Sequence, residues 1–130
     1  MKPALRRELR DLALVAAGAI PGAWLRWRLQ EINGGDRVGT VMANLLGCLL
    51  LGVVLARPIG SGRLALAVGI GFCGSLTTFS TLMLQLVQVA RAGRADTAAG
   101  LLLASLVGGV ALVALGHAIG AVLPAPQRRP

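Results

Sequence analysis

The sequence contains few charged and few aromatic side chains. Of its 130 residues, 14% are charged and 3% are aromatic, and tyrosine is absent. A soluble domain carries about 25% charged residues, so this composition argues against an ordinary soluble domain. The hydrophobic content of 55% excludes a disordered chain, and the 18 glycines follow no collagen-like period. The composition therefore indicates a chain of small apolar residues of the kind that packs closely in lipid.

Acidic residues are the scarcest charged type, with 5 Asp and Glu against 13 Lys and Arg. The net charge of +8 is also typical of nucleic-acid-binding proteins. The positions of the charges argue against a nucleic-acid partner, because residues 38–56, 64–90 and 97–123 contain no Asp, Glu, Lys or Arg. A fourth run, 12–29, has Arg26 and Arg28 only near its end, where they can reach the membrane surface.

These four runs define the predicted fold. Because about 20 helical residues cross a bilayer, we expect an all-α integral membrane protein with four transmembrane helices, forming one domain over residues 1–130. The basic start of the chain also resembles a signal peptide. Three further runs with short connections favour a retained first helix instead.

The basic residues specify the orientation of this domain only weakly. With four spans, eight of them lie on the side of both termini and five on the opposite side. The positive-inside rule gives a modest contrast for so basic a chain. The sequence is therefore compatible with insertion in both orientations.

The two cysteines and the single histidine do not form a recognisable metal site. Cys48 and Cys73 lie in separate runs with no CxxC pair, so we expect them to be packing residues. His117 lies near the end of the last run among apolar neighbours. We interpret it as an interfacial or packing histidine.

The third run contains an unusual cluster of hydroxyl groups. Gly69, Gly71 and Gly74 precede five hydroxyl side chains within residues 75–81. Carbonyl groups freed by a break in a membrane helix must find a cation, water or another protein group, and broken membrane helices commonly form ion sites. Alternatively, the hydroxyls bond back to their own helix while the glycines permit close packing.

Other uncharged polar residues lie inside the runs. Asn44 is the strongly polar residue of the second run, Thr40 lies one turn before it on the same face, and Ser105 lies in the fourth run. Asn44 is equally compatible with a role in helix packing, and Ser105 is more typical of a packing residue that bonds its own backbone. No carboxylate lies in any run, which argues against proton-coupled exporters and cationic drug transporters. Uncharged donors suit a small anion, because they replace hydration without trapping the ion.

Three segments resemble the Fluc (CrcB) family of fluoride channels. They are GAWLRW at 22–27, GTVMANLLG at 39–47 and GFCGSLTTFST at 71–81. The resemblance covers essentially the whole chain. It implies an antiparallel, dual-topology dimer with two pores in the cell membrane, which exports fluoride passively and lowers fluoride toxicity.

The resemblance also implies roles for individual residues. The expected pore residues are Asn44 as a donor to fluoride, Phe79 with its ring edge, the hydroxyls of Ser80 and Thr81, and Thr40 and Ser105. Arg26 corresponds to the basic residue at the vestibule. The backbone carbonyls of Gly74 and Thr77 would hold one structural Na⁺ at the centre of the dimer. No residue would be catalytic.

The chain departs from the family pattern at three positions. Leu82 replaces a second phenylalanine, Gln85 replaces a glutamate, and Ser75 replaces a glycine. Some members of the family work as pairs of paralogues with one degenerate pore. A homodimer is our expectation here, with a heterodimer as an alternative. A small cation or drug transporter that uses His117, or a non-conducting membrane subunit, are the competing functions.

Overall fold

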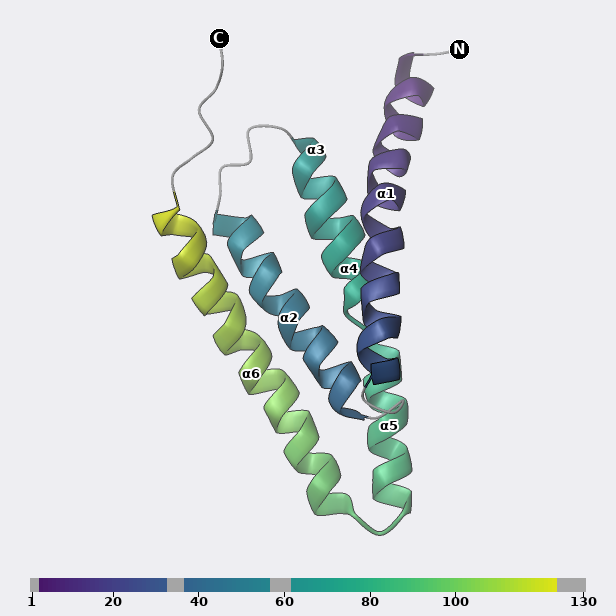
Figure 1. Ribbon diagram of the computed structural model, residues 1–130, viewed down its shortest axis with the longest axis vertical. Helices are drawn as coiled ribbons and strands as arrows, with labels where there is room; N and C mark the ends of the chain where they lie inside the picture. Colours follow the sequence, from purple (N-terminus) through teal and green to yellow (C-terminus); the bar gives the residue numbers. More distant parts are fainter. Residues whose placement is uncertain (1–2, 33–36, 57–61, 124–130) are drawn as a thin grey trace.

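The computed structural model describes residues 3–32, 37–56 and 62–123 (Figure 1). These residues form α1 (Pro3–Ile32), α2 (Arg37–Ala56), an interrupted third helix and α6 (Ala95–Val122). The third helix consists of α3 (Gly62–Leu64), the π-helical segment η1 (Ala65–Cys73), α4 (Gly74–Leu76) and α5 (Phe79–Arg91). No strand occurs in the described ranges, so the predicted all-α fold is confirmed.

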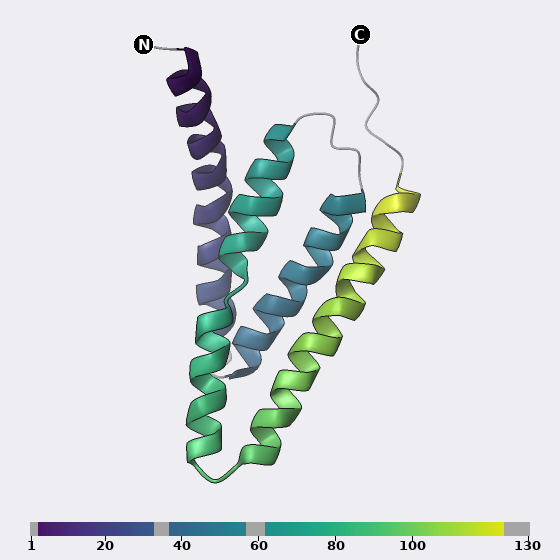
Figure 2. The ribbon, with the colours of Figure 1, turned by 180° about the vertical axis from the view of Figure 1, so that it is seen from behind.

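The third helix is broken at the predicted hydroxyl cluster. Thr77 has φ −84° and ψ 151°, and Thr78 has φ −148° and ψ 122°, so both residues are extended. Figure 2 shows the chain passing from α4 to α5 through this extended step. The prediction of a break in the third membrane helix is therefore confirmed.

Three helical segments are long and apolar enough to cross a membrane: Arg37–Ala56, Gly62–Arg91 and Ala95–Val122. The predicted span 12–29 lies within α1, which is not among these three segments. The structure thus supports a multi-pass membrane protein. It gives three clear spans and a fourth helix that extends beyond the predicted span.

One end of the helical assembly holds the four described basic residues among the eight that the sequence places on one side. The start of α1, the start of α3 and the ends of α2 and α6 lie at one end of the molecule, and the α5–α6 turn lies at the other (Figure 1). Arg6, Arg7, Arg10 and Arg63 are therefore at the first end. Lys2, Arg57, Arg128 and Arg129 lie outside the described residues.

Reciprocal glycine contacts hold α2 against α6. A side chain at Gly52 on α2 would meet the Val113 carbonyl, and one at Gly116 on α6 would meet the Leu49 carbonyl. Each glycine thus admits the backbone of the opposite helix. Small residues at a helix interface permit this approach and gain van der Waals packing in lipid.

The same arrangement holds α1 against η1. Gly18 on α1 faces the Ala67 carbonyl, while Gly71 on η1 faces the Val15 carbonyl. The first half of the broken helix is therefore fixed to α1. Its second half, α5, contacts α6 and α2 instead.

We predict that Gly116→Ala destabilises the protein by about 1 to 3 kcal/mol, the usual cost of overpacking a closely packed interface. Gly100→Ala is the matched control on the same helix, because a side chain there meets nothing within 4 Å. It should be neutral or stabilising, since alanine is the better helix former. Unfolding free energies of the detergent-purified proteins test this, and equal effects at both positions would contradict the packing described.

Candidate functional site at the helix break

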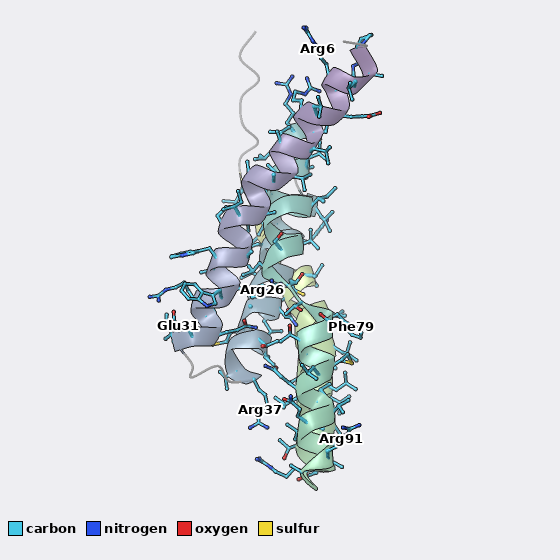
Figure 3. The ribbon with its side chains drawn as sticks, turned by 90° about the vertical axis from the view of Figure 1, so that its right-hand side faces the viewer. Arg6, Arg26, Glu31, Arg37, Phe79 and Arg91 are labelled. Carbon is cyan, nitrogen blue, oxygen red and sulfur yellow. The ribbon has the colours of Figure 1, made fainter. Side chains whose placement is uncertain are left out.

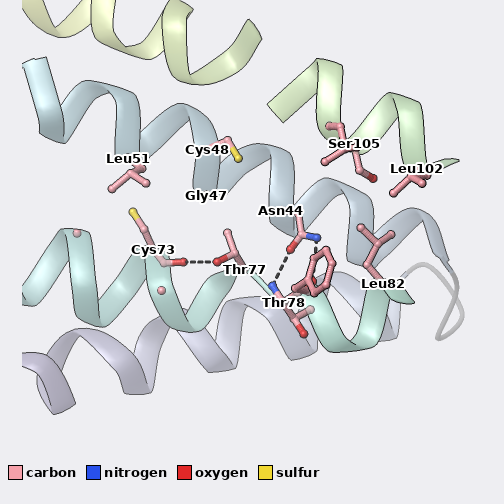
Figure 4. Close-up of a pocket in the computed structure, with 14 residues that line it drawn as sticks. Asn44, Gly47, Cys48, Leu51, Cys73, Thr77, Thr78, Leu82, Leu102 and Ser105 are labelled. Carbon is pink, nitrogen blue, oxygen red and sulfur yellow. Dashed lines mark hydrogen bonds between the residues drawn. The ribbon is translucent and has the colours of Figure 1, made fainter. Parts of the chain in front are cut away.

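Asn44 braces the broken helix from α2. The Thr78 N–H donates to Asn44 Oδ1 at 2.7 Å, and Asn44 Nδ2 donates to the Thr78 carbonyl at 3.0 Å. Figure 4 shows both hydrogen bonds. One side-chain amide therefore satisfies both backbone groups of an extended residue, where an unsatisfied group in lipid costs several kcal/mol.

The break interrupts the helical hydrogen bonds around it, including those to the Gly74 and Thr77 carbonyls. In a continuous helix the Thr78 N–H would donate to the Gly74 carbonyl and the Thr81 N–H to the Thr77 carbonyl. Here the first donates to Asn44 and the second to Thr78 Oγ1 at 3.3 Å. The carbonyls of Gly74 and Thr77 thus lose their normal partners.

The hydroxyls of the cluster bond back to their own helix and also cap the helix that follows the break. Thr77 Oγ1 bonds back to the Cys73 carbonyl at 3.0 Å. Thr78 caps α5 by accepting from the Thr81 N–H, and its hydroxyl donates to Thr81 Oγ1 at 3.0 Å. Ser80 Oγ lies 3.4 Å from Thr78 Oγ1. The cluster therefore ends one helix and begins the next.

A cavity of about 330 Å³ adjoins the break. Its polar lining comes from Asn44, Thr77, Thr78 and Ser105, and none of its lining residues among those described is Asp, Glu, Lys, Arg or His (Figure 4). Ser105 Oγ is buried without a hydrogen-bond partner among the described residues. The cavity thus combines an apolar wall with uncharged hydrogen-bonding groups.

Phe79 and Leu82 differ in their surroundings. Both Phe79 and Leu82 line the cavity. The side chain of Phe79 is 69% exposed, whereas that of Leu82 is 5% exposed. An exposed aromatic residue therefore occupies position 79, and a buried aliphatic residue occupies position 82.

A second polar cluster joins α1, α2 and α5. Thr40 is fully buried, and its hydroxyl oxygen accepts from Gln30 Nε2 at 3.1 Å and from Gln85 Nε2 at 3.0 Å. Gln85 Oε1 is buried without a partner among the described residues. Thr40 does not line the cavity, so this cluster is separate from the Asn44 brace one turn away.

Arg26 approaches the break from α1. Its Nη1 donates to the Thr77 carbonyl at 3.5 Å. Figure 3 shows Arg26 at the level of the chain where Phe79 begins α5. A positive charge therefore lies beside one of the carbonyls that lose their helical donors at the break.

The structure brings most of the predicted site residues to one place. Asn44, Gly74, Thr77, Phe79 and Ser105 line the cavity. Ser80 and Thr81 follow in the first turn of α5, while Thr40 and Arg26 lie outside the cavity lining. Cys48 and Cys73 also line it, and His117 does not.

Thr78 and Gln30 belong to these polar clusters but were absent from the predicted site residues. Thr78 provides the backbone groups that Asn44 binds, and Gln30 provides one of the donors to Thr40. The spacing of Thr78 and Thr81 at the start of a helix was a signal for capping. No local pattern pointed to Gln30.

The chain matches known proteins along most of its length. The profile of the family described as "CrcB-like protein, Camphor Resistance (CrcB)" matches residues 13–117. The chain is 45% identical over 124 residues to "Fluoride-specific ion channel FluC 2" of Parasynechococcus marenigrum (strain WH8102), covering 95% of this chain and 91% of that protein.

Two further relatives carry related names. "Fluoride-specific ion channel FluC 1" of the same organism is 40% identical over 120 residues, covering 85% of this chain and 94% of that protein. "Fluoride-specific ion channel FluC" of Pseudomonas syringae pv. maculicola is 37% identical over 116 residues, covering 83% and 91%. One organism thus holds two similar proteins.

We predict that Asn44→Leu lowers the free energy of unfolding by about 2 kcal/mol or more, because it leaves the two partly buried backbone groups of Thr78 without their hydrogen-bond partner. Ser105→Ala removes a hydroxyl without a partner in the same cavity. Its effect should stay within about 0.5 kcal/mol. Denaturation of both variants in detergent checks this, and an Asn44→Leu protein as stable as Ser105→Ala would show that Asn44 does not brace the break.

Proposed function

The chain belongs to the CrcB family, and from this premise we propose that it is a fluoride-specific ion channel that exports fluoride passively across the cell membrane. One observation carries this proposal. The chain aligns over 95% of its length with a protein named for that activity. The family consists of ion channels, so the chain is not an enzyme and no residue is catalytic.

The chemistry of the cavity supports an anion. Asn44 Nδ2 carries two hydrogens, of which the Thr78 carbonyl takes one, so the second is left for a ligand. The Ser105 hydroxyl has no protein partner among the described residues, and the exposed edge of Phe79 carries the positive end of the ring quadrupole. These groups replace the hydration of fluoride without a fixed cation that would trap it.

The driving force for export is electrical. A membrane potential is worth about 2.3 kcal/mol per elementary charge per 100 mV. With the cell interior negative, fluoride leaves by electrodiffusion through an uncharged path. The described cavity lining has no carboxylate or histidine, which favours this function over the transport of small cations or drugs through His117.

We propose that the working unit is an antiparallel, dual-topology homodimer. The weak contrast of basic residues between the two sides supports insertion in both orientations. Pairing with a paralogue is the alternative, since the organism of two relatives has both a FluC 1 and a FluC 2. Leu82 bears on this choice, because it removes the second aromatic position from this chain's own cavity.

We also propose one structural Na⁺ at the centre of that dimer. The carbonyls of Gly74 and Thr77 fit this role, because the break takes the helical donor from each of them. Open space lies beside Gly74, where a side chain would meet nothing within 4 Å. When bound, the ion would compensate backbone carbonyls that have lost their helical donors.

Reconstitution of the chain alone tests the channel. We expect liposomes loaded with fluoride to release it rapidly, as followed with a fluoride electrode, and to retain chloride in a parallel assay. Such efflux would establish a homomeric channel that tolerates Leu82. A well-folded protein without efflux would overturn the homomeric channel. Restored efflux after adding a FluC-type paralogue would then indicate a heterodimer.

Substitutions in the cavity test the pore. We expect Phe79→Leu to reduce fluoride efflux by about tenfold, the equivalent of about 1.4 kcal/mol in the barrier, because the polarised ring edge is lost. Phe72→Leu is the matched control, since Phe72 does not line the cavity. Asn44→Ala should also reduce efflux. Equal efflux from all of these proteins would argue against this cavity as the pathway.

A further inference from the structure

Arg26 contacts the Thr77 carbonyl, which is also one of the proposed sodium ligands. Its Nη1 lies 3.5 Å from the Thr77 carbonyl oxygen, at the long end of the hydrogen-bond range. The helical donor to that oxygen, the Thr81 N–H, is taken by Thr78 Oγ1. The guanidinium is thus the partner that the chain itself supplies to this carbonyl.

The hydrogen bond between Arg26 and the Thr77 carbonyl is weak enough for a cation to replace it. Arg26 is half-buried, and neither of the described salt bridges includes it. A long single hydrogen bond to a neutral carbonyl is far weaker than a bidentate bond to a carboxylate. A cation that binds the same oxygen can therefore displace the guanidinium.

We infer that Arg26 and Na⁺ compete for the Thr77 carbonyl, so that sodium binding releases the Arg26 guanidinium from the break. This inference rests on the sodium site proposed above. Two positive charges on one oxygen in a medium of low dielectric repel each other strongly. Arg26 therefore lowers the affinity for Na⁺, and by linkage Na⁺ lowers the occupancy of the Arg26 contact.

Thermal stability measured against sodium concentration tests the competition. Purified protein is titrated with NaCl at constant ionic strength, with N-methyl-D-glucamine chloride as the replacement salt. A ligand that binds only the folded state raises the melting temperature in a concentration-dependent way. In Arg26→Gln we expect the sodium concentration for half-maximal stabilisation to fall by about tenfold relative to the unmodified chain.

Arg28→Gln is the matched control. It removes the same charge two residues further along α1, but Arg28 pairs with Glu31 at 2.7 Å and does not contact the break. Its sodium dependence should equal that of the unmodified chain. A tenfold shift in both variants would indicate a general charge effect and would overturn the specific competition.

A second measurement needs no variant. Phenylglyoxal modifies accessible arginines, and peptide mass spectrometry reports the rate at Arg26 and Arg28 in one sample. Sodium should raise the rate at Arg26 several-fold and leave Arg28 unchanged. If Arg26→Gln fails to fold, this measurement still tests whether sodium releases Arg26 from the Thr77 carbonyl.

The outcomes separate the two proposals. If sodium stabilises the unmodified chain and Arg26→Gln at the same concentrations, the sodium site stands and the competition is wrong. If sodium stabilises none of the proteins, the sodium site and the competition both fail. Fluoride efflux tests the channel independently of either result.

Discussion

A polypeptide that leaves the helical conformation inside a membrane must find partners for its backbone, and this constraint governs the molecule. Thr77 and Thr78 are extended in the middle of a segment long enough to span the bilayer. Asn44 satisfies both backbone groups of Thr78 with one amide. The cavity, the released carbonyls and the exposed ring of Phe79 all follow from this single braced break.

The brace in turn depends on close packing. The asparagine side chain is short, so α2 has to lie close to the broken helix. At Gly47 a side chain would meet the Thr77 methyl group, so glycine is required there for the approach. Reciprocal glycines then fix η1 to α1 and α2 to α6. The break lies where these two packed pairs meet.

The sequence predicted the elements that depend on local chemistry. Charge-free runs located the helices, and hydroxyls after glycines located the break. It could not predict pairings between residues far apart, such as Gln30 and Gln85 on Thr40 or Arg26 on Thr77. Those contacts depend on how the helices rotate against each other, which no local pattern specifies. The resemblance predicted a pore role for Asn44, which stays a prediction, whereas its bonds to the Thr78 backbone are visible only in the structure. The dimer and the sodium ion stay predictions.

The hydrogen bonds between Asn44 and Thr78 constrain the amino acid at position 44 but not the one at position 78. Asn44 contributes its side chain, whereas Thr78 contributes main-chain atoms that any residue other than proline would offer. A substitution at position 78 therefore needs no compensating change at position 44. Correlated substitutions reveal many contacts between residues far apart in the sequence. They would not reveal the contact between positions 44 and 78, even though the break depends on it.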